Sequence, residues 1–306
     1  MPNNTYVDIV KFGEELTESM IQGSLTSPFI TSSVKWTGAK TFKFLGMNVS
    51  GFKNHNTAGG WNRGSVTMFD NEYTITHDRD IEYFVDKRDV LQNNGTLTVQ
   101  NILRKHVQEN SVPEMDAVFF ENVSKAAIKA NLKSETAIGD YTAENVYSKL
   151  KAMLKNGRLR AYRTSKSLIM YVNSDIMDLL EAAKDFTRKI EVTQIAEGGA
   201  GIETRVTSID GIPVMEVYDV ERFYTAFDYT ENFVPTGKKL NVCIVSLDTV
   251  KTVPLIDDVA ILNPEQCRHL GSGYAGQLRQ MYDTFVFPNN KGNKVDSVFV
   301  DYQPAG

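Results

Sequence analysis

The sequence of 306 residues predicts an α+β fold, and three observations carry this prediction. Residues 40–85 alternate apolar and polar side chains with the period of two that is typical of β-strands. Residues 97–130 repeat apolar side chains at the spacing of an amphipathic helix. Residues 140–244 alternate helical and strand-like segments, which predicts a compact mixed unit. Apolar residues make up 42% of the chain, so a substantial core can form.

The N-terminal residues 1–37 are expected to form an arm whose order depends on neighbouring molecules. The segment VDIVKFGEELTESMIQGSL predicts a short amphipathic helix. The segment TSPFITSSVKWTGAK is rich in Ser and Thr, and we expect it to hold no core.

Residues 40–85 predict one long β-hairpin with a polar, Gly-rich tip, NHNTAGGWNRGS. The returning strand reads SVTMFDNEYTITHDRDIEYFVD and is enriched in Thr, Val, Tyr and Ile. A two-stranded hairpin is marginally stable alone in water. Because nothing before it in the chain is large enough to support it, we expect the hairpin to lie on another surface.

A broken helix is predicted over residues 97–131. Pro113 lacks an N–H donor and clashes with the preceding turn, which predicts a break or kink there. At about 1.5 Å per residue, the two parts together span roughly 50 Å. Glu114 and Asp116 follow the restart of the helix, where acidic side chains favour the helix dipole.

Residues 140–244 predict several elements in order. A helix is stopped by Asn156-Gly157 and followed by the buried strand SLIMYVN. Next come the helix DIMDLLEAAKDF, the strand KIEVTQIA and the Gly-rich EGGAGIE. Residues 197–201 lack the Lys-Ser/Thr of a phosphate-binding loop, which favours a mobile loop. The hairpin TRVTSIDGIPVMEV turns at Asp-Gly.

The closing stretch QLRQMYDTFVFPNNKGNKVDSVFV contains an Arg, a Tyr and an Asp within five positions. Alternation over QMYDTFVF places largely apolar side chains on both faces, which predicts a strand that is covered on both sides. PNNKGN is typical of a turn, and KVDSVFV of the returning strand. We expect Arg279 and Asp283 to form a buried or interfacial ion pair rather than a catalytic pair.

The motifs indicate no enzyme, and we assign no catalytic, cofactor-binding or metal residue and no cofactor. The four histidines form no HExxH motif, and no G-x-S-x-G occurs. Cys243 and Cys267 fit neither a zinc site nor a disulfide framework. Around His77, THDRDIEYFVD favours a solvated strand face, with a divalent-metal site or an intersubunit charge contact as alternatives. A cytoplasmic hydrolase built on residues 140–244 is the alternative from another class.

Charge and hydropathy exclude further classes. The net charge of −5 argues against nucleic-acid binding by bulk charge. The N-terminus lacks the basic and apolar regions of a signal peptide, and the apolar runs are too short to span a membrane. We therefore expect a soluble protein made in a reducing cytoplasm.

Two stretches resemble the major capsid proteins of tailed bacteriophages, which have the HK97-like fold. Residues 73–120 are similar to the family's strand with an Asp-Arg pair (Asp78-Arg79), followed by a spine helix with Val-Pro-Glu-x-Asp (Val112 to Asp116). The closing stretch is similar to the family's last strands, and RVTSIDGIPVMEV to its strand–turn–strand. The order of these pieces carries the resemblance over residues 35–305.

The resemblance implies an HK97-like α+β architecture with four parts. These are an N-arm (1–37), an extended E-loop hairpin (38–88), a P-domain with the spine helix (89–135 and 245–306) and an A-domain (136–244). Some relatives carry a long N-terminal scaffolding segment, whereas this chain has a short arm before the hairpin. Either a separate scaffolding protein or an already mature chain would explain that difference.

The resemblance also implies a function. The chain would self-assemble as hexamers and pentamers into an icosahedral head, enclosing double-stranded DNA without sequence-specific binding. A portal protein and a scaffolding protein would be partners, no membrane would take part, and the virion capsid would be assembled in the host cytoplasm. An encapsulin-type compartment shell is the alternative. The expected intersubunit contacts are the hairpin tip (Trp61, Asn62, Arg63), the charged strand (Asp78, Arg79, Asp80) and the A-domain loop (Gly198, Gly199). No covalent crosslink is predicted.

Overall fold

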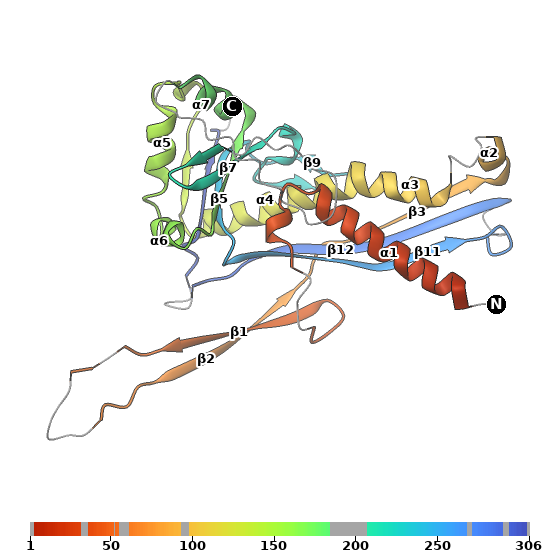
Figure 1. The fold of residues 1–306 in the computed structure, drawn as a ribbon, viewed down its shortest axis with the longest axis horizontal. Coiled ribbons are helices and arrows are strands. Elements are labelled where there is room, and N and C mark those ends of the chain that lie inside the picture. The colour runs from red at the N-terminus through yellow and green to blue at the C-terminus, as the bar shows by residue number, and fades with distance from the viewer. Residues whose placement is uncertain are drawn as a thin grey trace.

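The computed structural model describes residues 3–31, 36–51, 53–54, 61–92, 98–183, 207–267, 271–289 and 294–304. Figure 1 shows a body with a mixed sheet and its helices at one end, and a long helix and long strands that run away from that end. A two-stranded hairpin leaves the body separately. In the described parts of the chain, no helix combines the length and the apolar character that crossing a membrane requires.

The mixed sheet has six strands in the order β4-β13-β10-β5-β7-β6. Both central strands, β5 and β10, are buried along their whole length, because helices cover both faces of the sheet. One face packs against α5, α6 and α7, and the other against α4. The strands are β4 (Lys133–Glu135), β5 (Leu168–Asn173), β6 (Thr207–Ile209), β7 (Ile212–Val217), β10 (Leu240–Ser246) and β13 (Val298–Tyr302).

Short elements surround this sheet. They are η3 (Ile138–Asp140), α5 (Val146–Met153), α6 (Leu159–Thr164), α7 (Ser174–Ala182), η4 (Val220–Arg222), β8 (Phe227–Asp228) and β9 (Val234–Pro235). The predicted Asp-Gly hairpin is confirmed between β6 and β7: Asp210 has φ 51° and Gly211 φ 79°, the positive values that a type I′ turn needs. The predicted strand KIEVTQIA and the loop 197–201 lie outside the described residues.

The predicted long helix is confirmed, but it is not interrupted: its irregularity is a π-helical turn, and the residues at both junctions keep right-handed helical dihedral angles. It consists of α3 (Val99–His106), a π-helical turn η2 (Val107–Ser111) and α4 (Val112–Lys129). Pro113 lies in the first turn of α4, so the irregular turn falls directly before it. In the middle of α4, Met115, Phe119 and Phe120 are fully buried, which makes this helix the axis of the core.

A three-stranded antiparallel sheet in the order β11-β12-β3 runs beside this helix. Its strands are β3 (Asp78–Asp86), β11 (Val250–Leu262) and β12 (Gly273–Val286), and α2 (Lys87–Gln92) follows β3. The prediction that the closing strand is covered on both sides is confirmed, but KVDSVFV does not return beside it: β13 pairs with β10 and β4 in the mixed sheet. Leu278 and Tyr282 of β12 enter one core cluster, whereas Met281 and Phe285 enter another.

The N-terminal segment differs from its prediction. The amphipathic helix is confirmed as α1 (Asn3–Gly23), but it packs on the chain's own β11, with Leu16 and Met20 fully buried. The next turn, η1 (Ser27–Phe29), buries Phe29 with its ring centroid 4.9 Å from that of Phe119. The expectation that the Ser- and Thr-rich segment holds no core is therefore wrong for its first residues.

The physical reason lies in a buried carboxylate on α4. Asp116 is fully buried and accepts hydrogen bonds from Ser24 Oγ (2.6 Å), Thr26 Oγ1 (2.8 Å) and Arg222 Nη1 (2.9 Å). Ser and Thr are typical of a solvated arm, but here the hydroxyl groups of Ser24 and Thr26 donate to the buried carboxylate of Asp116. Burying this carboxylate without hydrogen-bond partners would be costly. Asp116 therefore anchors the N-terminal segment and does not simply favour the helix dipole.

The predicted single hairpin over residues 40–85 is wrong in its second half. The strands β1 (Thr41–Val49) and β2 (Val66–Thr74) pair from Thr41↔Thr74 to Val49↔Val66. After the short break 75–77, strand β3 leaves the hairpin and pairs with β12. Alternation continues through both strands, so period alone does not show where one partner replaces the other.

Candidate assembly interface at the β1–β2 hairpin

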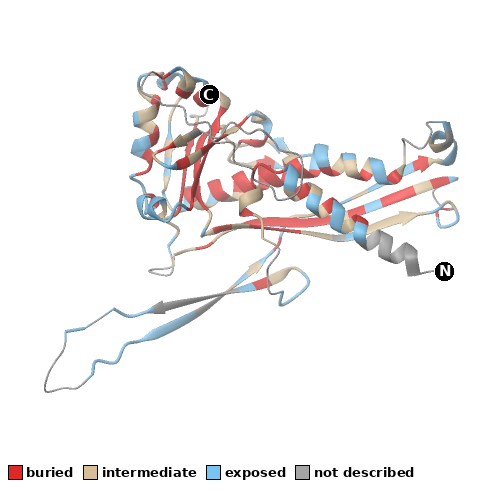
Figure 2. Cartoon of the chain, in the orientation of Figure 1, coloured by how far each residue is buried: buried red, intermediate tan, exposed pale blue. Residues whose placement is uncertain are grey.

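At the far end of the hairpin, the described side chains of residues 49–51, 53–54 and 61–68 are exposed (Figure 2). Val49 and Val66 oppose each other in the register, and Met68 lies two residues further along the same face of β2. Their exposed fractions are 59%, 61% and 70%. An apolar strand face in solvent marks an interaction surface. We call Val49, Val66 and Met68 the apolar hairpin face.

The base of the hairpin is fixed by aromatic rings. Phe42 of β1 is 1% exposed, and its ring centroid lies 5.0 Å from that of Phe285 on β12. Tyr73 of β2 lies 5.5 Å from Phe285 and 5.1 Å from Phe287. Burial raises the pKa of Tyr73, which therefore stays neutral. Each such pair contributes about 0.5–1.5 kcal/mol beyond its buried area.

Three consecutive residues at the junction of the hairpin and β3 form what we call the elbow: Thr76 and His77 of the break, and Asp78, the first residue of β3. Thr76 donates from its backbone N (3.0 Å) and from Oγ1 (2.9 Å) to Asp283 Oδ2. The other oxygen of this buried carboxylate accepts from Asn122 Nδ2 on α4 (2.6 Å). The first elbow residue is thereby bound to β12 and, through Asp283, to the long helix.

The second elbow residue is held by α4. His77 Nε2 lies 2.8 Å from Glu114 Oε1, and Arg79 Nε lies 3.0 Å from the same oxygen. The imidazole ring contacts the rings of Tyr229 and Tyr282, each with a centroid distance of 4.7 Å. Burial raises the pKa values of both phenols, so both stay neutral beside this ion cluster.

The third elbow residue is held by two cations. Asp78 accepts hydrogen bonds from Arg279 Nε (3.0 Å) and Nη2 (2.8 Å), and it also pairs with Lys40, which precedes β1. The hydrogen bonds from Arg279 and Lys40 hold the pKa of Asp78 well below its usual range. Asp78 thus joins both ends of the hairpin base to β12.

These contacts correct two predictions. Arg279 and Asp283 do not form the expected pair: four residues along a strand span about 13 Å. Arg279 binds Asp78, and Asp283 binds Thr76 and Asn122. The expected solvated strand face is also wrong at Asp78, which is bound by both cations. Within the described residues, no cluster of three potential metal ligands occurs.

The structure separates the residues that were predicted as intersubunit contacts. The tip is exposed, with Trp61 94% exposed and Asn62 Nδ2 donating to the carbonyl of Asn54 (2.8 Å). Arg63 and Asp80 are exposed as well. The bonds of Asp78 and Arg79 described above lie within the chain, and their role between subunits stays a prediction. Gly198 and Gly199 lie outside the described residues.

Sequence reasoning missed the partners of the elbow, Lys40, Glu114 and Asn122, because they come from distant segments. A local signal does exist. Residues 76–80, THDRD, are five consecutive polar residues, the longest polar run between Val66 and Asp86, and such an interruption favours a junction over a continuous strand.

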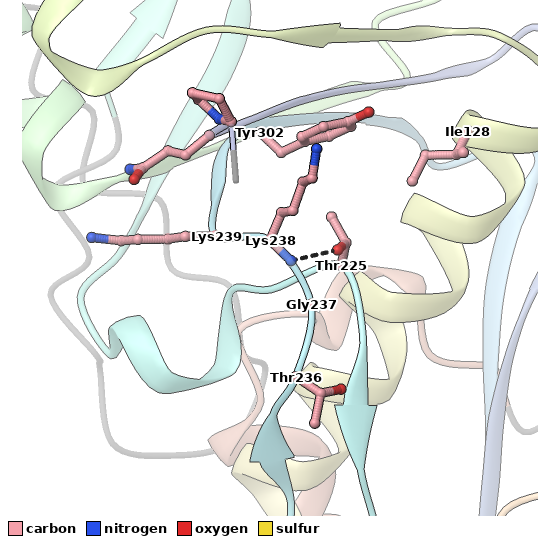
Figure 3. Close-up of a pocket in the computed structure, with 9 residues that line it drawn as sticks. Ile128, Thr225, Thr236, Gly237, Lys238, Lys239 and Tyr302 are labelled. Atoms are coloured by element: carbon pink, nitrogen blue, oxygen red, sulfur yellow. Dashed lines mark hydrogen bonds between the residues drawn. The ribbon is translucent and has the colours of Figure 1, made fainter. Parts of the chain in front are cut away.

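A pocket of about 560 Å³ lies near the C-terminal strand (Figure 3). Lys238 Nζ reaches over the Tyr302 ring at 5.0 Å and binds Glu135 Oε1 at 2.7 Å, and this carboxylate raises the pKa of the lysine. The lining residues, all of them described, include no His, Cys, Asp or Glu. The pocket therefore gives no support to the hydrolase alternative.

The fold of this chain is similar to the folds of solved phage capsids. No protein-family model matches the sequence, and neither does any curated protein. The capsid of cyanophage P-SCSP1u is similar in structure, with a TM-score of 0.65 at 12% identity, over 92% of this chain and 89% of that chain. The mature capsid of bacteriophage PhiM1 gives 0.60 at 15% identity, over 92% and 88%. This chain has the HK97-like capsid fold.

A third structure with this fold is a virus-like particle from Pyrococcus furiosus. Its TM-score is 0.52 at 12% identity, and the match covers 95% of this chain and 98% of that chain. The HK97-like similarity thus extends over nearly the whole chain. At such low identities it concerns the fold and assigns no role to single residues.

Proposed function

We propose that this chain is the shell subunit of an icosahedral bacteriophage head that encloses double-stranded DNA. The observation that carries the proposal is the β1–β2 hairpin, whose base is fixed to the body while its apolar face lies in solvent. The structural similarity to phage capsids supports the same conclusion. The function would be mechanical, since the chain would bind copies of itself and catalyse no reaction.

In this proposal the hairpin is the E-loop and lies across an adjacent subunit. Residues 1–37 act as the N-arm, 89–135 and 245–306 as the P-domain, and 136–244 as the A-domain, whose tips meet in hexamers and pentamers. Obligate interfaces typically bury more than about 2,000 Å². A hairpin that lies across a neighbouring subunit would contribute to such an area. A portal protein and a scaffolding protein complete the head, which forms in the host cytoplasm.

An encapsulin-type compartment is the second candidate. The match to the virus-like particle from Pyrococcus furiosus is compatible with it and covers nearly all of both chains, at a lower TM-score than the two phage capsids. A compartment and a phage head would use the hairpin in the same way and would differ in content.

Electron microscopy of the expressed full-length chain, with its nucleic acid extracted after nuclease treatment, tests the proposal. We expect closed shells when the chain is expressed with its neighbouring genes, and nuclease-protected double-stranded DNA inside them. Shells that hold an enzyme and no genome would favour the compartment. A stable monomer in analytical ultracentrifugation under all of these conditions would contradict both candidates.

A matched pair of variants tests the role of the hairpin in assembly. Met68→Asp places a charge on the apolar hairpin face, whereas Thr67→Asp places the same charge on the opposite face of the same exposed strand. We expect Met68→Asp to abolish shells and Thr67→Asp to retain them. Equal assembly of the two variants would show that this face does not dock.

A further inference from the structure

A strongly basic surface covers α5, α6 and the turn between them. Residues 149–166 contain seven Lys and Arg and no Asp or Glu. The whole chain has 33 basic and 38 acidic residues, so without these seven the remainder has 26 against 38, a net charge of −12. The basic surface is therefore a local exception in an acidic chain. Its members are Lys149, Lys151, Lys155, Arg158, Arg160, Arg163 and Lys166.

The backbone that carries this surface is rigid. Leu150, Leu154 and Leu159 are buried and hold both helices on the mixed sheet. Between the helices, Gly157 has φ 55°, and a Cβ there would lie 2.6 Å from the carbonyl oxygen of Asp296. The basic side chains therefore project from two helices and a turn whose backbone is fixed by packing. Figure 1 shows α5 and α6 at the edge of the body, far from the N-terminus.

The positive charge of the surface is only partly balanced. Lys151 Nζ (3.3 Å) and Arg163 Nη1 (3.5 Å) share the single carboxylate of Asp210. Arg158 Nε lies 4.0 Å from Asp296 Oδ2. Three further cations, Lys155, Arg160 and Lys166, are exposed and have no acidic partner among the described residues.

We propose that the basic surface on α5 and α6 binds the phosphate backbone of double-stranded DNA. The inference rests on the proposed function, because the DNA would be the enclosed genome. The phosphate backbone of DNA is negatively charged along its whole length. Residues 149–166 offer it seven cations with no acidic residue between them. Arginine and lysine contacts to phosphate are independent of sequence, so all duplexes should bind alike.

The contact should be weak and sensitive to salt. If Lys155, Arg160 and Lys166 each neutralise one phosphate, the slope of log K against log salt is about −2.7. Affinity then falls roughly 40-fold between 50 and 200 mM salt. The net charge of −12 on the rest of the chain repels DNA elsewhere, so binding stays confined to this surface.

Fluorescence anisotropy of a labelled 30-base-pair duplex with the full-length, unassembled chain tests the inference. The test variant is Lys155→Gln/Arg160→Gln/Lys166→Gln. The control variant removes two Lys and one Arg at exposed positions elsewhere and has the same net charge: Lys11→Gln/Arg88→Gln/Lys129→Gln. We expect the test variant to lose at least tenfold in affinity and most of its salt slope, and the control to change less than threefold.

Three results would overturn the inference. The first is an unchanged salt slope in the test variant, and the second is an equal loss in the control. The third is a test variant that binds DNA normally but no longer assembles, which would assign the surface to an acidic face of a second copy. Electron microscopy of the same samples distinguishes this inference from the proposed function. If the basic surface binds DNA but the chain forms no shells, only the proposed function is refuted.

Discussion

Asp283 is the carboxylate on which the elbow depends, and its isosteric replacement allows a quantitative prediction. Its Oδ2 accepts from Thr76 N and Oγ1, and its Oδ1 accepts from Asn122 Nδ2 (2.6 Å) and Thr284 N (2.9 Å). Both oxygens therefore face donors. In Asp283→Asn, the new amide NH₂ must face one of these donor pairs, whichever way the side chain is turned.

The expected cost is about 2–4 kcal/mol, since two charge-assisted hydrogen bonds are lost and buried donors are left without an acceptor. Hydrogen exchange of the unassembled chain measures it. The amide of Thr76 and those of the hairpin base should exchange roughly 30-fold faster or more, because about 1.4 kcal/mol corresponds to a factor of ten. The control is Asp80→Asn, an exposed carboxylate on the adjacent strand, which should cost less than about 0.5 kcal/mol. Equal protection in the two variants would refute the assignment of Asp283 as the anchor of the elbow.

Three further predictions concern the hairpin base and the A-domain. Phe42→Ala should destabilise the hairpin base by about 3–5 kcal/mol in hydrogen exchange, because it empties a buried aromatic site; a change below about 1 kcal/mol would contradict this. The pKa of Asp78 is lowered in the folded state, so its contribution is fully present above about pH 4 and is lost as the pH falls further. Elbow protection in the wild type should therefore weaken only below about pH 4, whereas Asp78→Asn should lack this titration; an identical pH profile would contradict the role of the ion pairs. Gly211→Ala meets no atom within 4 Å but forces φ 79° on a residue with a Cβ, so urea unfolding should show a loss of about 1–2 kcal/mol, and no loss would refute a strained turn.

Local patterns predicted the elements well where the physical cause is local. The π-helical turn before Pro113 follows from its missing donor, and the turn at Asp210 and Gly211 follows from their tolerance of positive φ. The two-sided cover of β12 follows from alternation with apolar residues on both faces.

The errors share a different cause, which is pairing over long separations in the sequence. Alternation continues from β2 into β3, but the partner changes from β1 to β12. Ser24 and Thr26 are buried because Asp116, some 90 residues away, needs donors. Neither the apolar periodicity nor the composition of a segment shows which distant segment it will contact. The resemblance of the ordered pieces to a known family supplied the architecture that local patterns could not.

In the assembled state, an adjacent copy should cover the apolar hairpin face. Maleimide labelling of Met68→Cys and of Thr67→Cys, each in free subunits and in purified particles, measures whether this face is covered. Both native cysteines are fully buried, and burial raises the pKa of the Cys243 thiol, so labelling reports the introduced thiol. We expect fast labelling of Met68→Cys in free subunits, strong protection of it in particles, and less protection of Thr67→Cys. Equally fast labelling of Met68→Cys in particles would contradict it.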